Sequence, residues 1–338
     1  MWSLSRARRA VIASALVMPL LLLPGASDAQ EQGPYPGLPE LPSEQDQATR
    51  NTYGWLGVAQ VGRAYSPVAQ QWGRVPAGLL ATNIEFRTTE FTDDNGDLNV
   101  TADYDIYAYL LPTGGGGDDY GVSPVITIRT VAFGSIPTEV QLQLRQRRDT
   151  SDLPFGFHIE TQFTDNYARQ LRTYPPTGFE DVVDVAVLGL RIDAVDVPLA
   201  DTCATGPSAR LALASEAVVV DQGAGETFDQ DRGFSGIEGG TLDGSLDIPP
   251  FTGCSTPDGD DLSAVLTSVI SGPGNPVTVK LGILGCYYGF DEETFAPLPA
   301  LPGTPIAEAG CAPDVSEDVE GIPSPLPFPE GVDDEVAP

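Results

Sequence analysis

The chain has very few of the side chains that catalysis most often uses. Its 338 residues include a single histidine, His158, and a single lysine, Lys280. A Ser-His-Asp or Cys-His mechanism needs histidine as its base, and a histidine-ligated catalytic zinc site needs more than one. The sequence also contains no GxSxG motif, no P-loop and no Ser-x-x-Lys nucleophile. These absences argue against histidine-dependent nucleophilic hydrolases, P-loop enzymes and Ser-x-x-Lys enzymes.

Positive charge is also scarce. Seventeen Lys and Arg residues stand against 48 Asp and Glu residues, which gives a formal net charge of −31. Binding to phosphates requires clustered basic residues, so nucleic acids and anionic lipid surfaces are not expected partners. The one dense basic cluster is formed by Arg145, Arg147 and Arg148. It could contact an anionic envelope polymer or simply solvate the end of a strand, and we favour the second interpretation.

The single histidine lies in a stretch where apolar and polar residues alternate. The alternation in Phe155–Phe163 predicts a strand that directs Phe157 and Ile159 to one face and His158 and Glu160 to the other. The first face would pack in the core and the second would meet water. We therefore expect His158 to face solvent and not to act as a catalytic base.

Long hydrophobic runs are absent except at the start of the chain. Arginines at positions 6, 8 and 9 precede an apolar segment, 10–24, and small residues precede a cleavage point that we place after Ala29. This pattern predicts a signal peptide over residues 1–29. No other segment is long enough to cross a bilayer as a helix. We expect a secreted, extracellular protein, with association with the cell envelope as a further alternative.

Four cysteines follow the predicted signal peptide: Cys203, Cys254, Cys286 and Cys311. An even number in an exported protein predicts two disulfides, and four cysteines allow three pairings. We favour Cys203–Cys254 and Cys286–Cys311, because each closes a moderate loop and the second would hold the end of the chain to the body. The wide spacing of the cysteines and the absence of a CxxC motif argue against a metal site.

Glycine and proline are abundant, at 37 and 31 residues, which favours a turn-rich β fold over long helices. The predicted fold class is all-β, with β-sandwich architecture, about ten strands, one short helix and a disordered acidic proline-rich tail. The expected organisation begins with a signal peptide (residues 1–29), a linker (30–50) and an N-terminal β region (51–150). A disulfide-stabilised C-terminal β-sandwich module (151–296) and the tail (297–338) follow. A single continuous sandwich is the alternative to a division near residue 151.

Period-2 alternation identifies the individual strands. The expected strands are Asn83–Phe91, Asp97–Leu111, Val125–Phe133, Thr138–Arg148, Phe155–Phe163, Val182–Val197, Ala209–Val220 and Pro276–Leu284. Asn95-Gly96, between the first two, predicts a hairpin turn. A helix is expected over Leu262–Ile270, capped by Asp260 or Asp261 and ended by Gly272 with Pro273.

Four motifs in the C-terminal half occur in a characteristic order: Cys203-Ala204-Thr205, Gly240-Thr241-Leu242-Asp243-Gly244, Ile248-Pro249-Pro250-Phe251-Thr252-Gly253-Cys254 and Ser271-Gly272-Pro273-Gly274-Asn275. Together they resemble a family of secreted actinobacterial proteins with Cys-Arg-Thr-like, IPxFxGC and SGPGN segments. The resemblance covers Leu153 to Cys286, and it departs from the pattern at Ala204, where the family commonly has arginine. It implies an all-β secreted module with a Cys203–Cys254 bridge, and it implies no activity. The physical role we assign to these motifs is structural.

Two chemistries compatible with the composition remain. Asp93, Asn95, Asp97 and Asn99 alternate around the predicted hairpin turn and offer the hard oxygen ligands that calcium prefers. The glycine position and the absence of a later glutamate ligand depart from an EF-hand, so a plain turn explains the same residues. No other cofactor is expected. A glycosidase needs only two carboxylates, which the many acids could supply without any motif.

The leading hypothesis from the sequence is a non-catalytic secreted or envelope-associated β protein that acts as a binding or structural module. Its partner would be a cell-wall polymer or another secreted protein, and the sequence does not define an oligomeric state. The rival hypothesis is a carboxylate-dependent polysaccharide hydrolase. Two buried carboxyls about 5–10 Å apart in an aromatic-lined cleft would favour the rival. Tyr104, Tyr107 and Tyr109 are the aromatic residues that would line such a cleft.

Overall fold

The computed structural model describes residues 52–111, 120–132 and 136–282. Contacts divide the chain into two units, Met1–Pro36 and Gly37–Pro338, and all described residues belong to the second. The predicted signal peptide, linker and tail lie outside the described residues. The same is true of Cys286 and Cys311, so their predicted bridge stays a prediction.

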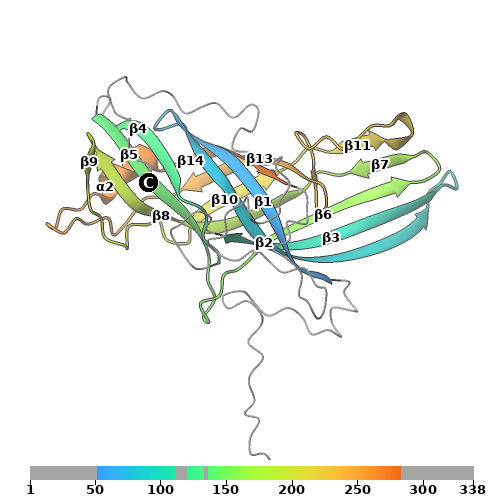
Figure 1. Ribbon diagram of the computed structural model, residues 1–338, viewed down its shortest axis with the longest axis horizontal. Helices are drawn as coiled ribbons and strands as arrows, with labels where there is room; N and C mark the ends of the chain where they lie inside the picture. Colours follow the sequence, from blue (N-terminus) through green and yellow to red (C-terminus); the bar gives the residue numbers. More distant parts are fainter. Residues whose placement is uncertain (1–51, 112–119, 133–135, 283–338) are drawn as a thin grey trace, which may run out of the picture. The chain divides into compact units, whose positions relative to one another are not determined.

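The described residues form an antiparallel sheet of fourteen strands. In chain order these are β1 (Thr52–Ser66), β2 (Gln71–Thr92), β3 (Leu98–Leu111), β4 (Ile126–Ala132), β5 (Ile136–Gln146), β6 (Phe157–Asn166), β7 (Leu171–Tyr174), β8 (Gly178–Ile192), β9 (Val195–Asp196), β10 (Ala209–Ala214), β11 (Val218–Asp221), β12 (Phe234–Ser235), β13 (Gly239–Ile248) and β14 (Gly272–Leu281). A short 3-10 helix, η1 (Gln222–Ala224), and one α-helix, α2 (Ser263–Ile270), complete the described elements. The all-β prediction is confirmed (Figure 1).

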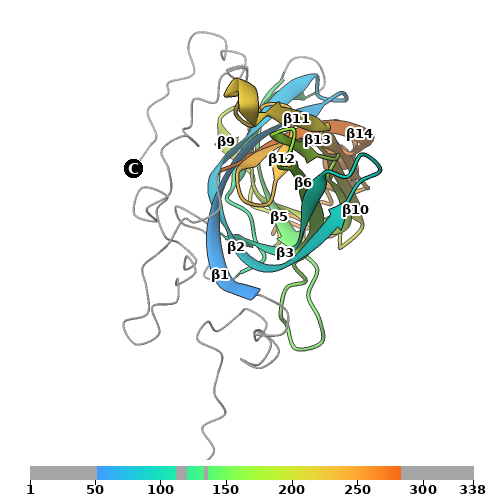
Figure 2. The ribbon, with the colours of Figure 1, turned by 90° about the vertical axis from the view of Figure 1, so that its right-hand side faces the viewer.

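The sheet folds over so that its halves face each other. The strand order is β11-β7-β6-β3-β2-β1-β14-β13-β10-β8-β5-β4, and β6 also pairs with β8 through Glu160 and Gly178. Figure 2 shows the strands curving around a common interior. Strands that precede residue 151 in the sequence pair with strands that follow it, so both regions share one sheet. Examples are the pairs β1–β14, β3–β6 and β5–β8. The apolar faces meet between the two halves, as in the predicted sandwich.

Side-chain alternation builds the core. On β6, Phe157 and Ile159 are buried while His158 and Glu160 are exposed. The buried side chains of the facing strands join one continuous apolar cluster, to which Leu242 of β13 also belongs. Removal of apolar surface from water contributes about 25 cal/mol of free energy per Å², and this is the main force that holds the folded sheet together.

Two expected strands are each divided in the structure. The predicted Val182–Val197 becomes β8 and β9, because Asp193 and Ala194 adopt positive φ angles of 49° and 61° and reverse the chain. The predicted Ala209–Val220 becomes β10 and β11, which pair with different neighbours. Strand β10 lies between β8 and β13, whereas β11 pairs with β7. Apolar residues occur on both sides of each break, so each segment was expected as one strand, although the apolar positions change phase there, as from Leu213 to Val218.

The predicted helix is confirmed as α2, but its cap is different from the one expected. Leu262 occupies the N-cap position and makes no side-chain capping bond. Asp261 instead accepts a hydrogen bond from the Ser263 amide at 2.9 Å. A hydrogen bond from the Ser263 side chain lowers the pKa of the Asp261 carboxyl, and the bond from the Ser263 amide lowers it further. The helix ends at Ile270, and the expected turn after it is instead the start of β14.

The Asn95-Gly96 turn joins β2 and β3, as predicted, with Thr92 opposite Leu98. Gly96 has a φ of 87°, and a Cβ at this position would meet no atom within 4 Å. Substitution should therefore affect only the backbone conformation. We expect Gly96→Ala to lower the free energy of unfolding by about 1 kcal/mol, because alanine rarely adopts positive φ.

Gly96→Asn is the matched control for this turn, since asparagine tolerates the left-handed region better than alanine. Urea denaturation followed by circular dichroism would measure both changes. Equal losses in the two variants would contradict the conformational explanation.

Candidate functional site

The register between β3 and β6 brings three polar side chains together on the outer face of the sheet. Asp105 lies opposite Glu160, and Tyr107 lies opposite His158. The His158 Nε2 atom is 3.2 Å from Asp105 Oδ1 and 4.0 Å from Glu160 Oε1. The His158 side chain is 43% exposed, so the prediction that it faces solvent is confirmed.

Tyr107 fixes the orientation of the imidazole. The two rings are stacked, with centroids 4.7 Å apart and planes inclined by 9°. Stacking restricts rotation of the His158 ring, and the contact between Nε2 and Asp105 restricts it further. The nitrogen is thus directed at the carboxylates before any ligand arrives.

The two carboxylates also border an open hollow of about 410 Å³. Its remaining lining comes from β3, from β6 and from the segment that follows β7: Asp103, Tyr104, Thr161, Gln162, Pro175 and Pro176. Ligand atoms of Asp105, His158 and Glu160 all lie within 4.8 Å of one another. Among the described residues, this is the group of His, Cys, Asp and Glu side chains that could hold a metal ion. We call Asp105, His158 and Glu160 the outer cluster.

The three tyrosines of β3 do not form one aromatic cleft. Tyr107 belongs to the outer face, whereas Tyr104 is buried and packs near Phe86 and Phe163. Tyr109 is also buried, and desolvation raises its pKa to about 12. Tyr104 and Tyr109 therefore serve packing, and Tyr109 is protonated at neutral pH.

The predicted calcium ligands are occupied by contacts within the turn. Asp93 Oδ1 accepts hydrogen bonds from the amides of Asn95 at 2.9 Å and Asp97 at 3.0 Å. The hydrogen bond from the Asp97 amide is the largest influence that lowers the pKa of the Asp93 carboxyl. Asp97 Oδ2 accepts from Arg169 Nε at 2.9 Å, and the buried Asn99 donates to the Asp97 carbonyl. These contacts favour the plain hairpin turn over a calcium site.

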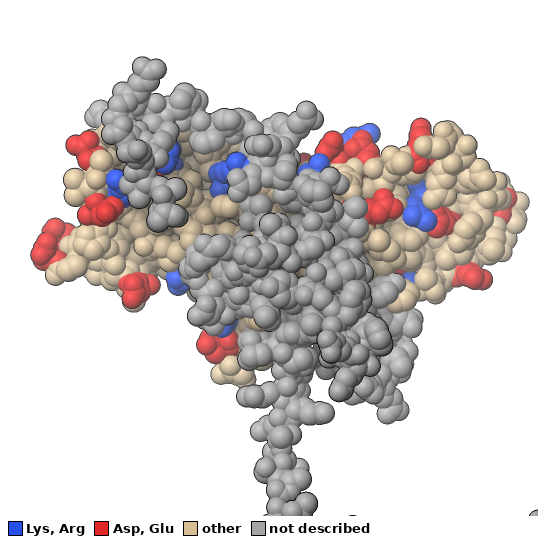
Figure 3. All heavy atoms as spheres, in the orientation of Figure 1, with Lys and Arg blue, Asp and Glu red and all other residues tan. Residues whose placement is uncertain are grey.

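The basic cluster is likewise engaged within the chain. Arg147 bonds to Asp181 at 3.0 Å and lies over the Phe155 ring. Arg148 donates to the carbonyl of Tyr120 at 2.9 Å and also to that of Asp152. The contacts that both arginines make within the chain favour a role at a strand end over contact with an anionic envelope polymer. The acidic side chains of the described residues that are visible in Figure 3 are dispersed over this face.

The spatial criterion for a carboxylate-dependent hydrolase is not met by the described residues. Asp165 is the one carboxylate among them that is buried. It forms a two-point ion pair with Arg172, at 2.6 and 2.8 Å, so both of its oxygens are occupied. The carboxylates of the outer cluster are open to water instead.

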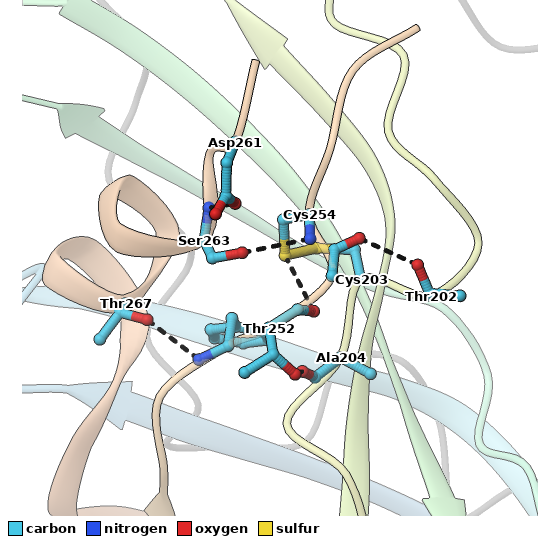
Figure 4. The surroundings of a disulfide bond; sticks show 10 residues. Thr202, Cys203, Ala204, Thr252, Cys254, Asp261, Ser263 and Thr267 are labelled. Atoms are coloured by element: carbon cyan, nitrogen blue, oxygen red, sulfur yellow. Dashed lines mark hydrogen bonds between the residues drawn. A yellow bond between two sulfur atoms is a disulfide. The ribbon is translucent and has the colours of Figure 1, made fainter. Parts of the chain in front are cut away.

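The cysteine motifs form a structural junction. Cys203 and Cys254 are fully buried and disulfide-bonded, with Cα atoms 4.2 Å apart (Figure 4). Backbone hydrogen bonds between Ala204 and Thr252 flank the bridge in both directions, at 2.9 and 3.1 Å. Gly253 has a φ of 70°, and a Cβ there would lie 2.6 Å from the Thr202 carbonyl oxygen. The predicted Cys203–Cys254 pairing is confirmed.

The same junction anchors the helix. The Cys254 amide donates to Ser263 Oγ at 3.2 Å, and the Phe251 amide donates to Thr267 Oγ1 at 2.9 Å. Figure 4 shows both hydroxyls directed from α2 toward the segment that carries the bridge. The motif residues are thus used in holding α2 against the sheet, which supports the structural role assigned to them.

Comparison with family models, with curated proteins and with solved structures finds no match to this chain. The resemblance to secreted actinobacterial proteins therefore remains a prediction based on the motifs. None of the helices among the described residues is long and apolar enough to cross a membrane.

Proposed function

We propose that this chain is an exported, non-catalytic binding protein whose outer cluster holds a divalent metal ion. The predicted signal peptide and the buried disulfide support export, because disulfides persist in oxidising compartments. The observation that carries the binding function is the convergence of Asp105, His158 and Glu160, of which the two carboxylates line a solvent-open hollow.

The donor set defines the class of ligand. One imidazole nitrogen with carboxylate oxygens suits zinc and other borderline divalent ions better than calcium, which prefers oxygen ligands alone. Three ligands leave coordination positions open on the solvent side. A bound ion there could bridge the protein to an anionic group of a cell-wall polymer or of another secreted protein, which are the partner classes expected from the sequence.

Zinc is the probe for this proposal. Titration of the exported protein without a histidine tag should give a saturable one-site isotherm by calorimetry. His158→Ala removes the nitrogen ligand, and we expect it to weaken zinc binding by at least about tenfold. Asp105→Asn should weaken binding as well, because the amide loses the negative charge.

Gln162→Ala is the matched control, since Gln162 lies on the same strand and lines the hollow without being part of the outer cluster. Circular dichroism would verify that all variants fold. Saturable binding that His158→Ala leaves unchanged would place zinc elsewhere and contradict the proposal, as would the absence of saturable binding to the wild type.

A further inference from the structure

A second site lies inside the folded sheet, on the opposite face of β3 and β6 from the outer cluster. The structure contains a cavity of about 110 Å³ between the two halves of the sheet. Its walls include buried side chains from six strands that are distant in sequence: Leu80, Leu110, Leu142, Leu211, Leu242 and Val277. Protein interiors normally leave few voids larger than one water molecule, so a space of this size is unusual.

The lining disfavours water and charged ligands, because nearly all of its side chains are apolar. Gln60 and Ser123 are the polar residues in the wall, and all the others are apolar. The Ser123 hydroxyl is already engaged, because it donates to the Pro124 carbonyl at 2.8 Å and accepts from the Leu144 amide at 2.9 Å. A water molecule needs two to four polar partners, and an apolar cavity without them stays dry and takes up apolar molecules.

The size of the cavity limits the ligand. Apolar cavities of roughly 150 Å³ are known to accept benzene or xenon. A space of about 110 Å³ therefore suits one small ring or a short branched hydrocarbon, and it is too small for the whole of a drug-sized molecule. Binding would restore the dispersion contacts that the lining side chains lack across the empty space.

We propose that the interior of the folded sheet is a binding site for a small, uncharged apolar molecule of about the size of a single aromatic ring. Recognition rests on shape and apolar contact. This site is separate from the outer cluster, because inward-facing and outward-facing residues alternate along β3 and β6. Loss of one function should leave the other intact.

Benzene is the probe for the cavity. Titration of the full chain with benzene, followed by methyl NMR, should shift the methyl resonances of cavity residues such as Leu110, Leu211 and Leu242 in a saturable manner. Ala108→Leu and Ala64→Leu each add side-chain volume at a position that lines the cavity. We expect each to weaken benzene binding by at least about tenfold, a loss within the range that one or two methylene groups produce in an apolar pocket.

Two substitutions at different strands keep the test informative if one of them fails to fold. Val219→Ala is the control, because Val219 is exposed on β11 and a surface apolar contact would respond to it. Binding that is saturable, lost in the filled variants and retained in Val219→Ala supports the site. Absence of saturable shifts, or equal binding by the filled variants, overturns it, whatever the outcome of the zinc titration.

Discussion

Removal of the Cys203–Cys254 disulfide is expected to lower the free energy of unfolding by about 4 kcal/mol. The bridge joins residues 51 positions apart, so it removes considerable freedom from the unfolded chain. A double substitution to alanine is the suitable change, because both sulfurs are fully buried and a serine hydroxyl would add an unsatisfied polar group. Urea denaturation of the double variant and of the wild type measures the difference.

Alkylation of the unreduced wild type, followed by mass spectrometry, provides the companion measurement. Cys203 and Cys254 should remain unlabelled until a reductant is added. A double-alanine variant with an unchanged urea midpoint would show that the junction is held by the hydrogen bonds around Ala204, Thr252 and α2 alone. Weakening of α2 should accompany the loss of stability, because Cys254 and Ser263 lie in the same network.

Local patterns in the sequence predicted much of the fold, since alternation is a property of neighbouring residues. The orientation of His158, the Asn95-Gly96 turn and the α2 segment all follow from spacings of a few residues. The outer cluster could not be predicted in this way. Asp105 and His158 are 53 positions apart, and their contact depends on the register between β3 and β6.

The strand β13 shows a second limit of prediction from sequence. Its segment, Gly239–Ile248, is rich in glycine and polar residues, which have low β-propensity. In the structure, Gly244 lies against β10 so closely that a Cβ would be 1.9 Å from the Ala212 carbonyl oxygen. The glycine is required by close approach of two backbones, and only the tertiary structure reveals that requirement. The same limit applies to the cavity, whose wall combines residues from most of the sheet.

The largest effect of a single side chain is expected at Arg172. Its guanidinium pairs with the buried Asp165 through two hydrogen bonds and lies over the Phe163 ring, with 4.4 Å between the guanidinium carbon and the ring centroid. The hydrogen bonds to Asp165 raise the pKa of Arg172, so the arginine is charged throughout the accessible pH range. Removing one partner of such a pair leaves the other charge buried without compensation.

We expect Arg172→Ala to lower the free energy of unfolding by about 3 kcal/mol, the lower end of the range for buried pairs, because the arginine side chain is 25% exposed. Arg210→Ala is the matched control. Arg210 on β10 also pairs with an acid on the neighbouring strand β8, Glu180, at 2.6 Å. Both side chains are more than half exposed, at 57% and 62%. Solvent screens that pair, so its loss should have no measurable effect.

Chemical denaturation of both variants measures whether an ion pair stabilises the protein only when it is buried, as at Arg172, or also when it is exposed, as at Arg210. Arg172→Lys should recover part of the loss, since lysine restores the charge but cannot make the two-point contact. Asp165→Asn should also destabilise the protein, because the amide keeps the shape but removes the charge that faces Arg172. Equal stability of Arg172→Ala and Arg210→Ala would show that the β6–β7 pairing is held by its backbone hydrogen bonds and by the packing of Tyr174 with Val218 and Val220.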